Sequence, residues 1–106
     1  MKFKQNSIVI FNTIAQSTFR LVDSAYQLAA NREALLTAGI NGDHGENSLH
    51  YQGLAWDFRL NDVKNKDLLF ATLRAELPQA LYDVVWEGRG EKWEHLHVEY
   101  DVKPKR

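Results

Sequence analysis

Two short segments of the chain carry three of its four histidines, each in the company of carboxylates. The first segment contains His50 and, seven positions later, Asp57. The second, near the C-terminus, contains His95 and His97 with a glutamate on either side. Two imidazole nitrogens, one carboxylate oxygen and an open fourth position form a donor set with which zinc activates water. The two segments could supply that set if the fold brings them together.

Each segment alone is weak support for a metal site. Asp57 lies between Trp56 and Phe58, and a carboxylate in an apolar run is costly to bury unless a cation meets it. That cation could be Arg59, a lysine or a metal ion. Read alone, this spacing is more typical of a salt-bridged aspartate beside a surface histidine.

The second segment also offers groups for proton transfer. Glu94 precedes the third candidate ligand, His97, by three positions, and its carboxylate could take a proton from water and pass it to a leaving amine. On an ideal strand the two side chains point to opposite faces, so this role requires irregular backbone. Glu91 is the alternative base. His95 shares a face with His97 and could be a ligand or could stabilise an oxyanion.

Length and composition limit what the chain can be. Its 106 residues, 44% hydrophobic and 25% charged, predict one globular domain over residues 1–106. A formal net charge of -1 gives no reason to expect nucleic acid as a partner. The chain has no cysteine, so a metal would be held by His, Asp and Glu. We find no membrane span or export signal, and expect a protein made in the cytoplasm.

Apolar periodicity predicts two helices among short strands. Residues 7–11 are read as a possible strand, and residues 33–38 as helix or, better, a short buried strand. A glycine-rich loop over 39–47 then leads into His50. The remaining elements are a helix from about 17 to 31, a strand over 54–60, a helix over 67–77 and strands over 81–86 and 92–102.

The last strand connects this architecture to the chemistry. Leu96 and Val98 alternate with His95 and His97, so one face of the strand is aliphatic and the other carries histidines. The histidine face is therefore expected to line a cleft. The order of elements predicts an α+β fold with a small, mostly antiparallel sheet and helices packed on one side.

Taken together, the two segments match a known joint motif. It reads Ser48-x-His50-x-x-Gly53-x-Ala55-x-Asp57 followed by Glu94-x-x-His97. This motif resembles the zinc D-alanyl-D-alanine carboxypeptidases, the VanX-type dipeptidases and the phage L-alanyl-D-glutamate endopeptidases, which share the hedgehog/DD-peptidase fold. The resemblance runs from about Leu35 to Asp101 and is closest to small phage-type members.

The resemblance implies a role for each motif residue. It makes His50, Asp57 and His97 the zinc ligands, Glu94 the general base and His95 a histidine beside the metal. It also implies an arginine that stabilises the carbonyl oxygen, for which Arg20 and Arg32 are both candidates. Residues expected to contact substrate or to support the loops around it are Ser48, Arg59, Arg32 and His44.

The function that the resemblance implies is hydrolysis of an amide bond in peptidoglycan stem peptides. The bond would be of the D,D-carboxypeptidase or the L-Ala-D-Glu endopeptidase type. A phage or prophage lysis enzyme that reaches the cell wall through a holin pore fits the lack of an export signal. The alternative is a non-catalytic, zinc-containing binding or structural phage protein of the same fold.

Overall fold

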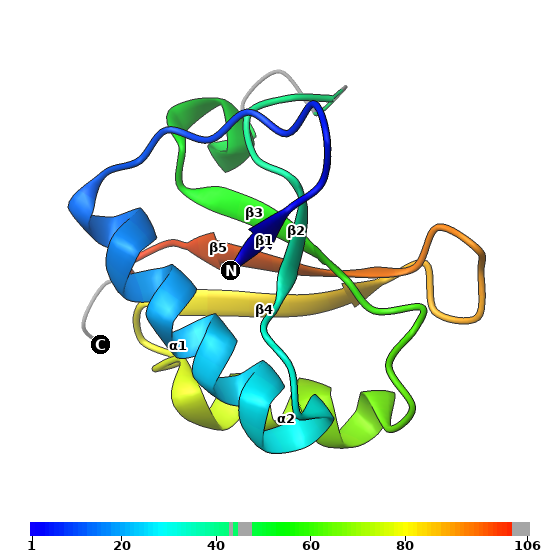
Figure 1. The fold of residues 1–106 in the computed structure, drawn as a ribbon. Helices are drawn as coiled ribbons and strands as arrows, with labels where there is room; N and C mark the ends of the chain where they lie inside the picture. The colour runs from blue at the N-terminus through cyan, green and yellow to red at the C-terminus, as the bar shows by residue number, and fades with distance from the viewer. Residues whose placement is uncertain (43, 45–47, 103–106) are drawn as a thin grey trace.

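The computed structural model describes residues 1–42, 44 and 48–102, which form a small α+β domain (Figure 1). Neither helix in this part of the chain is long and apolar enough to cross a membrane. In chain order the elements are β1 (Lys2–Phe3), α1 (Thr13–Ala30), β2 (Leu35–Ala38), the 3-10 turn η1 (Leu49–Gln52), β3 (Ala55–Arg59), α2 (Lys66–Glu76), β4 (Tyr82–Glu87) and β5 (His95–Tyr100).

The five strands form one mixed sheet in the order β1-β2-β3-β5-β4. β1 pairs with β2 in parallel, whereas the other three pairings are antiparallel. The prediction of a mostly antiparallel sheet is therefore wrong. The difference comes from the N-terminus, where no strand was predicted over residues 2–3. Helix α1 carries the chain from β1 to β2 as a crossover, and a crossover of this kind joins parallel strands.

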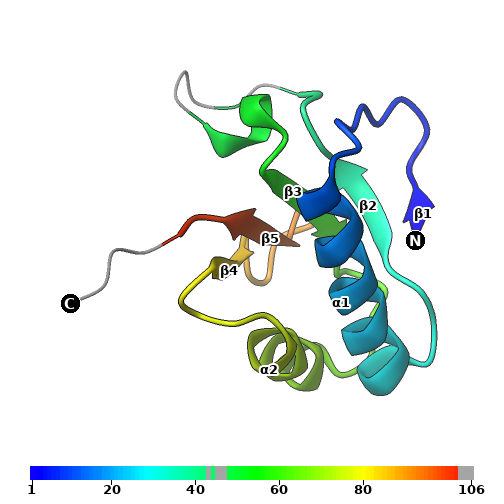
Figure 2. The same ribbon diagram turned by 90° about the vertical axis from the view of Figure 1, so that its left-hand side faces the viewer.

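The two helices lie beside each other and pack on the sheet through aromatic side chains (Figure 1 and Figure 2). From α1, Phe19 meets Trp56 and Phe58 edge-on at centroid distances of 5.6 and 6.4 Å. From α2, Phe70 lies 5.8 Å from Trp86. These contacts place the hydrophobic core between the helices and one face of the sheet.

Helix α1 begins four residues before the predicted start. Asn12 caps it, because its side-chain oxygen accepts a hydrogen bond from the backbone N–H of Ala15 at 2.7 Å. The predicted caps Ser17 and Thr18 therefore lie inside the helix. The predicted end is confirmed: Asn31 adopts the left-handed conformation at the C-cap. The predicted strand over 7–11 is wrong, since these residues form no strand.

The other predicted elements are present with shifted ends. The ambiguous segment 33–38 contains β2, in agreement with the strand reading. The 54–60, 67–77 and 81–86 elements each end within one residue of β3, α2 and β4. The last strand is shorter than its predicted range of 92–102, because residues 91–93 form a turn before β5.

The predicted alternation along β5 is present in the structure and defines a second, open face of the sheet. Leu96 and Val98 are completely buried on the helix side, whereas the neighbouring histidines are only partly buried. Antiparallel register then builds two rows of side chains that each contain a histidine across the open face. One row aligns Asp57, His97 and Val85, and the other aligns Arg59, His95 and Glu87.

Candidate metal centre

Three side chains predicted as metal ligands converge on one point of the open face. Nδ1 of His97 lies 3.0 Å from Oδ1 of Asp57, and Nε2 of His50 lies 3.3 Å from the same oxygen. The two ring nitrogens are 3.2 Å from each other. The fold therefore brings together donor atoms from residues that are 47 positions apart in the sequence.

The 3-10 turn η1 positions the first of these ligands. Ser48 caps the turn, and its hydroxyl accepts a hydrogen bond from the backbone N–H of His50 at 3.1 Å. Gly53 ends the turn with a φ of 72°, and a Cβ there would lie 2.8 Å from Cβ of Ile10. A residue with a side chain would be strained at this position. The motif glycine therefore allows the tight return of the chain into β3.

Hydrogen bonds on the far side of each ring direct the other nitrogen toward the centre. Nδ1 of His50 donates to the carbonyl oxygen of Gly39 at 2.7 Å, which leaves Nε2 as the inward atom. Nε2 of His97 donates to Oε1 of Glu99 at 2.7 Å, which leaves Nδ1 as the inward atom. Metal-binding histidines are typically held by such a bond to a carbonyl or a carboxylate.

Mutual contacts set the charges of these groups. Burial alone would raise the pKa of Asp57, but hydrogen bonds from His50 and His97 outweigh it and hold the pKa well below its ordinary value. Burial alone would lower the pKa of His97, but its hydrogen bonds to Asp57 and Glu99 raise the pKa to about 9. The carboxylate is therefore ionised, and the polar surroundings favour positive charge at the centre.

The three residues fit a bound metal ion. Ligand atoms that bind tetrahedral zinc at about 2.0–2.1 Å lie about 3.3–3.4 Å from one another. The separations of 3.0, 3.2 and 3.3 Å in this cluster are close to that spacing. The donor set of two imidazoles and one carboxylate leaves the fourth tetrahedral position to the cavity in front of it. These side chains can hold a divalent metal in a site open to a small molecule.

A carboxylate that was not predicted stands beside the three ligands. Oε1 of Glu87 lies 3.1 Å from Nε2 of His95 and 3.6 Å from Nδ1 of His97. Sequence reasoning missed Glu87 because it ended the strand at Trp86. Extending the alternation of β4 by one residue would have placed Glu87 across from His95 in the hairpin register.

His95 lies on the rim of the cluster. Its Nε2 is 3.7 Å from Oδ1 of Asp57, farther than the nitrogens of His50 and His97. Its Nδ1 is 3.0 Å from the carbonyl oxygen of Trp93, so the ring is held between the turn and Glu87. This arrangement favours a role beside the metal over one as a ligand.

The loop before η1 supplies one wall of the site. The ring of His44 stacks on the ring of His50 at 3.7 Å with an angle of 3° between the planes. Nε2 of His44 is hydrogen-bonded to the carbonyl oxygen of Asn41 at 2.8 Å. Other residues of the predicted 39–47 loop (43 and 45–47) lie outside the described residues. The open cavity in front of the cluster is lined by His44, Ser48, His50, Asp57, Glu87, His95 and His97.

Glu94, the predicted base, is bound by groups outside the ligand cluster. Its carboxylate is paired with the Lys66 ammonium group and accepts hydrogen bonds from Nε1 of Trp86 at 3.1 Å and from the Gly90 N–H at 3.2 Å. The hydrogen bond from Lys66, with those from Trp86 and Gly90, lowers the pKa of Glu94 to about 2. Glu94 lines a cavity that also includes Asp57 and His95, but these contacts occupy its carboxylate.

The remaining predicted residues divide between the site and other places. Arg59 lies in the row next to the cluster, whereas Arg32 forms a bidentate ion pair with Asp62 at 2.8 and 3.0 Å. The structure therefore does not bring Arg32 to the metal side. Arg20 is exposed on α1, in the helix layer, and Glu91 is exposed in the turn between β4 and β5.

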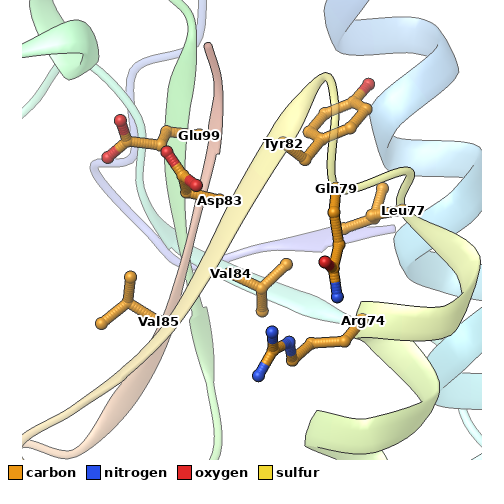
Figure 3. A pocket seen from close by; sticks show the side chains of 8 residues that line it. All are labelled: Arg74, Leu77, Gln79, Tyr82, Asp83, Val84, Val85 and Glu99. Carbon is orange, nitrogen blue, oxygen red and sulfur yellow. The ribbon is translucent and has the colours of Figure 1, made fainter. Parts of the chain in front are cut away.

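A different cavity, at the edge of the sheet, contains no part of the ligand cluster (Figure 3). Asp83 of β4 and Glu99 of β5 lie side by side there, and Arg74 extends from α2. Glu99, which lines this cavity, also bonds to His97 of the centre. This cavity belongs to the surroundings of the site.

Comparison with known proteins adds no assignment. No protein-family model, curated protein or solved structure matches the chain at a significant level.

Proposed function

We propose that this protein is a zinc-dependent peptidase that hydrolyses an amide bond in peptidoglycan stem peptides. The observation that carries the proposal is the convergence of His50, Asp57 and His97 on an open cavity, with the carboxylate of Glu87 beside them. The substrate class rests on the resemblance of the joint motif to zinc peptidases of the hedgehog/DD-peptidase fold.

In this proposal the three ligands hold zinc and Glu87 moves the proton. Zinc, when bound, lowers the pKa of water and polarises a scissile carbonyl. Glu87 takes the proton of the attacking water and passes it to the leaving amine. Nε2 of His95 is hydrogen-bonded to Oε1 of Glu87 and orients that carboxylate. Glu87 replaces Glu94 as the base because the donors around Glu94 occupy its carboxylate.

The biological setting of the proposal is lysis of a bacterial cell wall. A phage or prophage enzyme made in the cytoplasm would reach peptidoglycan through a holin pore. The second candidate, a non-catalytic zinc-containing binding or structural phage protein, is favoured by one observation. The motif glutamate, Glu94, is engaged in structural contacts, as it could be in a protein that keeps the fold without the activity.

The test is digestion of purified peptidoglycan by the zinc-loaded protein. We expect new amino groups to appear in the wild type, with cleaved stem peptides identified by mass spectrometry. Glu87→Gln should reduce the rate by about 10²–10⁴-fold while zinc remains bound. Glu91→Gln, in the nearby turn, is the matched control and should keep the wild-type rate.

Two outcomes would contradict the proposal at different levels. A zinc-loaded wild type that cleaves no bond would support the non-catalytic alternative. Full activity in Glu87→Gln, with loss in Glu91→Gln or Glu94→Gln, would leave the peptidase assignment standing and give the proton transfer to the residue whose loss abolishes turnover.

A further inference from the structure

Beside the three proposed zinc ligands, Nε2 of His95 and Oε1 of Glu87 face each other at 3.1 Å. Both residues line the open cavity in front of the cluster. Neither belongs to the ligand set His50, Asp57 and His97, so a zinc ion held by that set leaves both donor atoms available. The centre therefore has more donor atoms than one tetrahedral ion with an open position uses.

The hydrogen bonds around His95 leave a place for a cation between its ring and Glu87. Nδ1 of His95 lies 3.0 Å from the carbonyl oxygen of Trp93, which can only accept, so this nitrogen carries a hydrogen. In the neutral ring, Nε2 then presents a lone pair to the Glu87 carboxylate, which also can only accept. Two such acceptors repel each other unless a proton or a metal ion lies between them. The place that a proton fills can therefore hold a divalent cation.

Asp57 completes a second set of donor atoms. Its Oδ1 lies 3.7 Å from Nε2 of His95, and a carboxylate oxygen of Asp57 lies within 4.8 Å of one of Glu87. Ligand atoms of tetrahedral zinc lie about 3.3–3.4 Å from one another, so a small movement of the Glu87 side chain completes the set. A carboxylate has two oxygens, so Asp57 can bridge two ions, which lie about 3.5–4 Å apart in two-metal sites.

We propose that His95, Glu87 and Asp57 form a second zinc site, which adjoins the first and shares Asp57 with it. One imidazole and two carboxylates are ligands that zinc accepts. The His95 ring is already held as metal-binding histidines typically are, because its other nitrogen donates to a backbone carbonyl. The second ion displaces the proton between His95 and Glu87 into solvent.

The second site binds zinc more weakly than the first. The side chains of Glu87 and His95 are 44% and 23% exposed, whereas those of the first site are between 3% and 14% exposed. More exposed side chains lose more conformational freedom when they bind an ion. The first ion also repels the second. The second site therefore fills only when free zinc is in excess, and gel filtration removes its ion.

The second ion inhibits the proposed peptidase by occupying its base. This consequence rests on the proposed function, whereas the site itself does not. Glu87 bound to a zinc ion cannot take the proton of the attacking water. The protein with one zinc is therefore active, and the protein with two is inhibited.

Metal titration tests the site without any need for turnover. The metal-free wild type should bind zinc in two classes that differ in affinity by at least about tenfold, which isothermal calorimetry resolves. In a titration with Co²⁺, the second equivalent should change the electron paramagnetic resonance signal of the first, because two ions that share a carboxylate are magnetically coupled. A single class of zinc in the wild type would overturn the proposal.

Substitution assigns the second class to its ligands. His95→Ala and Glu87→Gln each remove a donor from the second site alone, so both should keep the first class and lose at least about tenfold in affinity for the second. Glu91→Gln, in the exposed turn, is the matched control and should keep both classes. Two full classes in His95→Ala would overturn the proposal.

The loop side of the centre offers a competing location for a second ion. Donor atoms of His44, His50 and Asp57 also lie within 4.8 Å of one another. The variant His44→Ala should keep both classes of zinc if the second ion lies at His95. Loss of the second class in His44→Ala, with retention in His95→Ala, would overturn the proposal and place the second ion on the loop side.

Peptidoglycan digestion at rising zinc concentration separates this proposal from the proposed function. The rate of the wild type should rise with the first equivalent and fall at least about tenfold as the second site fills, and His95→Ala should not show the fall. An active wild type whose rate stays constant with two ions bound would overturn the assignment of Glu87 as a ligand. Two classes of zinc without cleavage would keep the second site and reject the peptidase. Cleavage with a single class would keep the peptidase and reject the second site.

Discussion

The carboxylate of Glu99 lies 2.7 Å from Nε2 of His97, on the side of the ring that faces away from Asp57. The two residues are two positions apart on β5 and share the open face of the sheet. Because a carboxylate can only accept, Nε2 must carry the proton and Nδ1 must face the cluster. Glu99 therefore positions a candidate metal ligand without being a ligand itself.

Loss of this contact should weaken zinc binding. Replacing Glu99 with alanine removes the acceptor that fixes the ring of His97, and we expect zinc affinity to fall by about 10–100-fold. Glu99→Gln keeps an oxygen acceptor and should recover part of the loss. Affinity is measured by competition with a chromophoric chelator, and the absorption spectrum of the cobalt-substituted protein reports the ligand geometry.

The neighbouring carboxylate Asp101 provides the matched control for Glu99. Asp101 belongs to the same acidic group as Glu99, so Asp101→Asn also removes one negative charge near the centre. If zinc affinity depends only on local charge, Glu99→Gln and Asp101→Asn will bind zinc equally weakly. An unchanged cobalt spectrum in Glu99→Ala would likewise contradict a positioning role.

The assignment of ligands predicts a specific pattern of zinc content. The wild type should hold about one zinc per chain, because His50, Asp57 and His97 form one donor set of two imidazoles and a carboxylate. His50→Ala and His97→Ala should each lose it, while His44→Ala should retain it, since His44 contributes a ring stacked on His50 and is not one of the three proposed ligands. Metal analysis after gel filtration measures all four proteins. Zinc loss in His44→Ala, with retention in His97→Ala, would mean that the metal is held by His44 and not by His97.

Much of the fold and of the ligand set could be predicted because local pattern determines it. The alternation of Leu96 and Val98 with His95 and His97 fixes which face of β5 is buried. The pairing of β1 could not be predicted in the same way, since two residues carry no periodic signal. Its place depends on the crossover through α1, which is a tertiary relationship.

The identity of the base could not be read from spacing. Spacing put Glu94 near His97, but its carboxylate is bound by Lys66, which is 28 positions away in the sequence, and by Trp86 of the neighbouring strand. Glu87 reaches the cluster only through the register of the β4–β5 hairpin.

The lowered pKa of Glu94 predicts that the stability of the fold decreases at acid pH. Its pKa is about 2 in the folded protein and 4.5 in the absence of its partners, so the unfolded chain binds more protons between these values. The stabilisation is therefore present above pH 4.5 and is lost as the pH falls toward 2. Urea unfolding of the metal-free protein at several pH values should show this loss.

The variant Glu94→Gln isolates that contribution. It should be less stable than the wild type at neutral pH, and the difference should narrow as the pH falls below 4.5. Glu91→Gln should follow the wild type throughout, because Glu91 is exposed in the turn. A constant difference between Glu94→Gln and the wild type over this range would mean that the ion pair with Lys66 is not the source of the stability.

Gly53 of the motif connects backbone geometry to the metal centre. Gly53→Ala places a Cβ 2.8 Å from Cβ of Ile10 at a φ of 72°, whereas Gly90→Ala meets nothing within 4 Å at a φ of 87°. Both substitutions place an alanine in a left-handed backbone conformation, which destabilises the fold by about 1 kcal/mol. The clash adds to this at Gly53 alone, and we expect a total cost of about 2–3 kcal/mol in urea unfolding of the metal-free protein. Because η1 carries His50, Gly53→Ala should also weaken zinc binding, and Gly90→Ala should not. Equal stability losses with wild-type zinc affinity in both would show that the turn tolerates a side chain and that the glycine does not position the ligand.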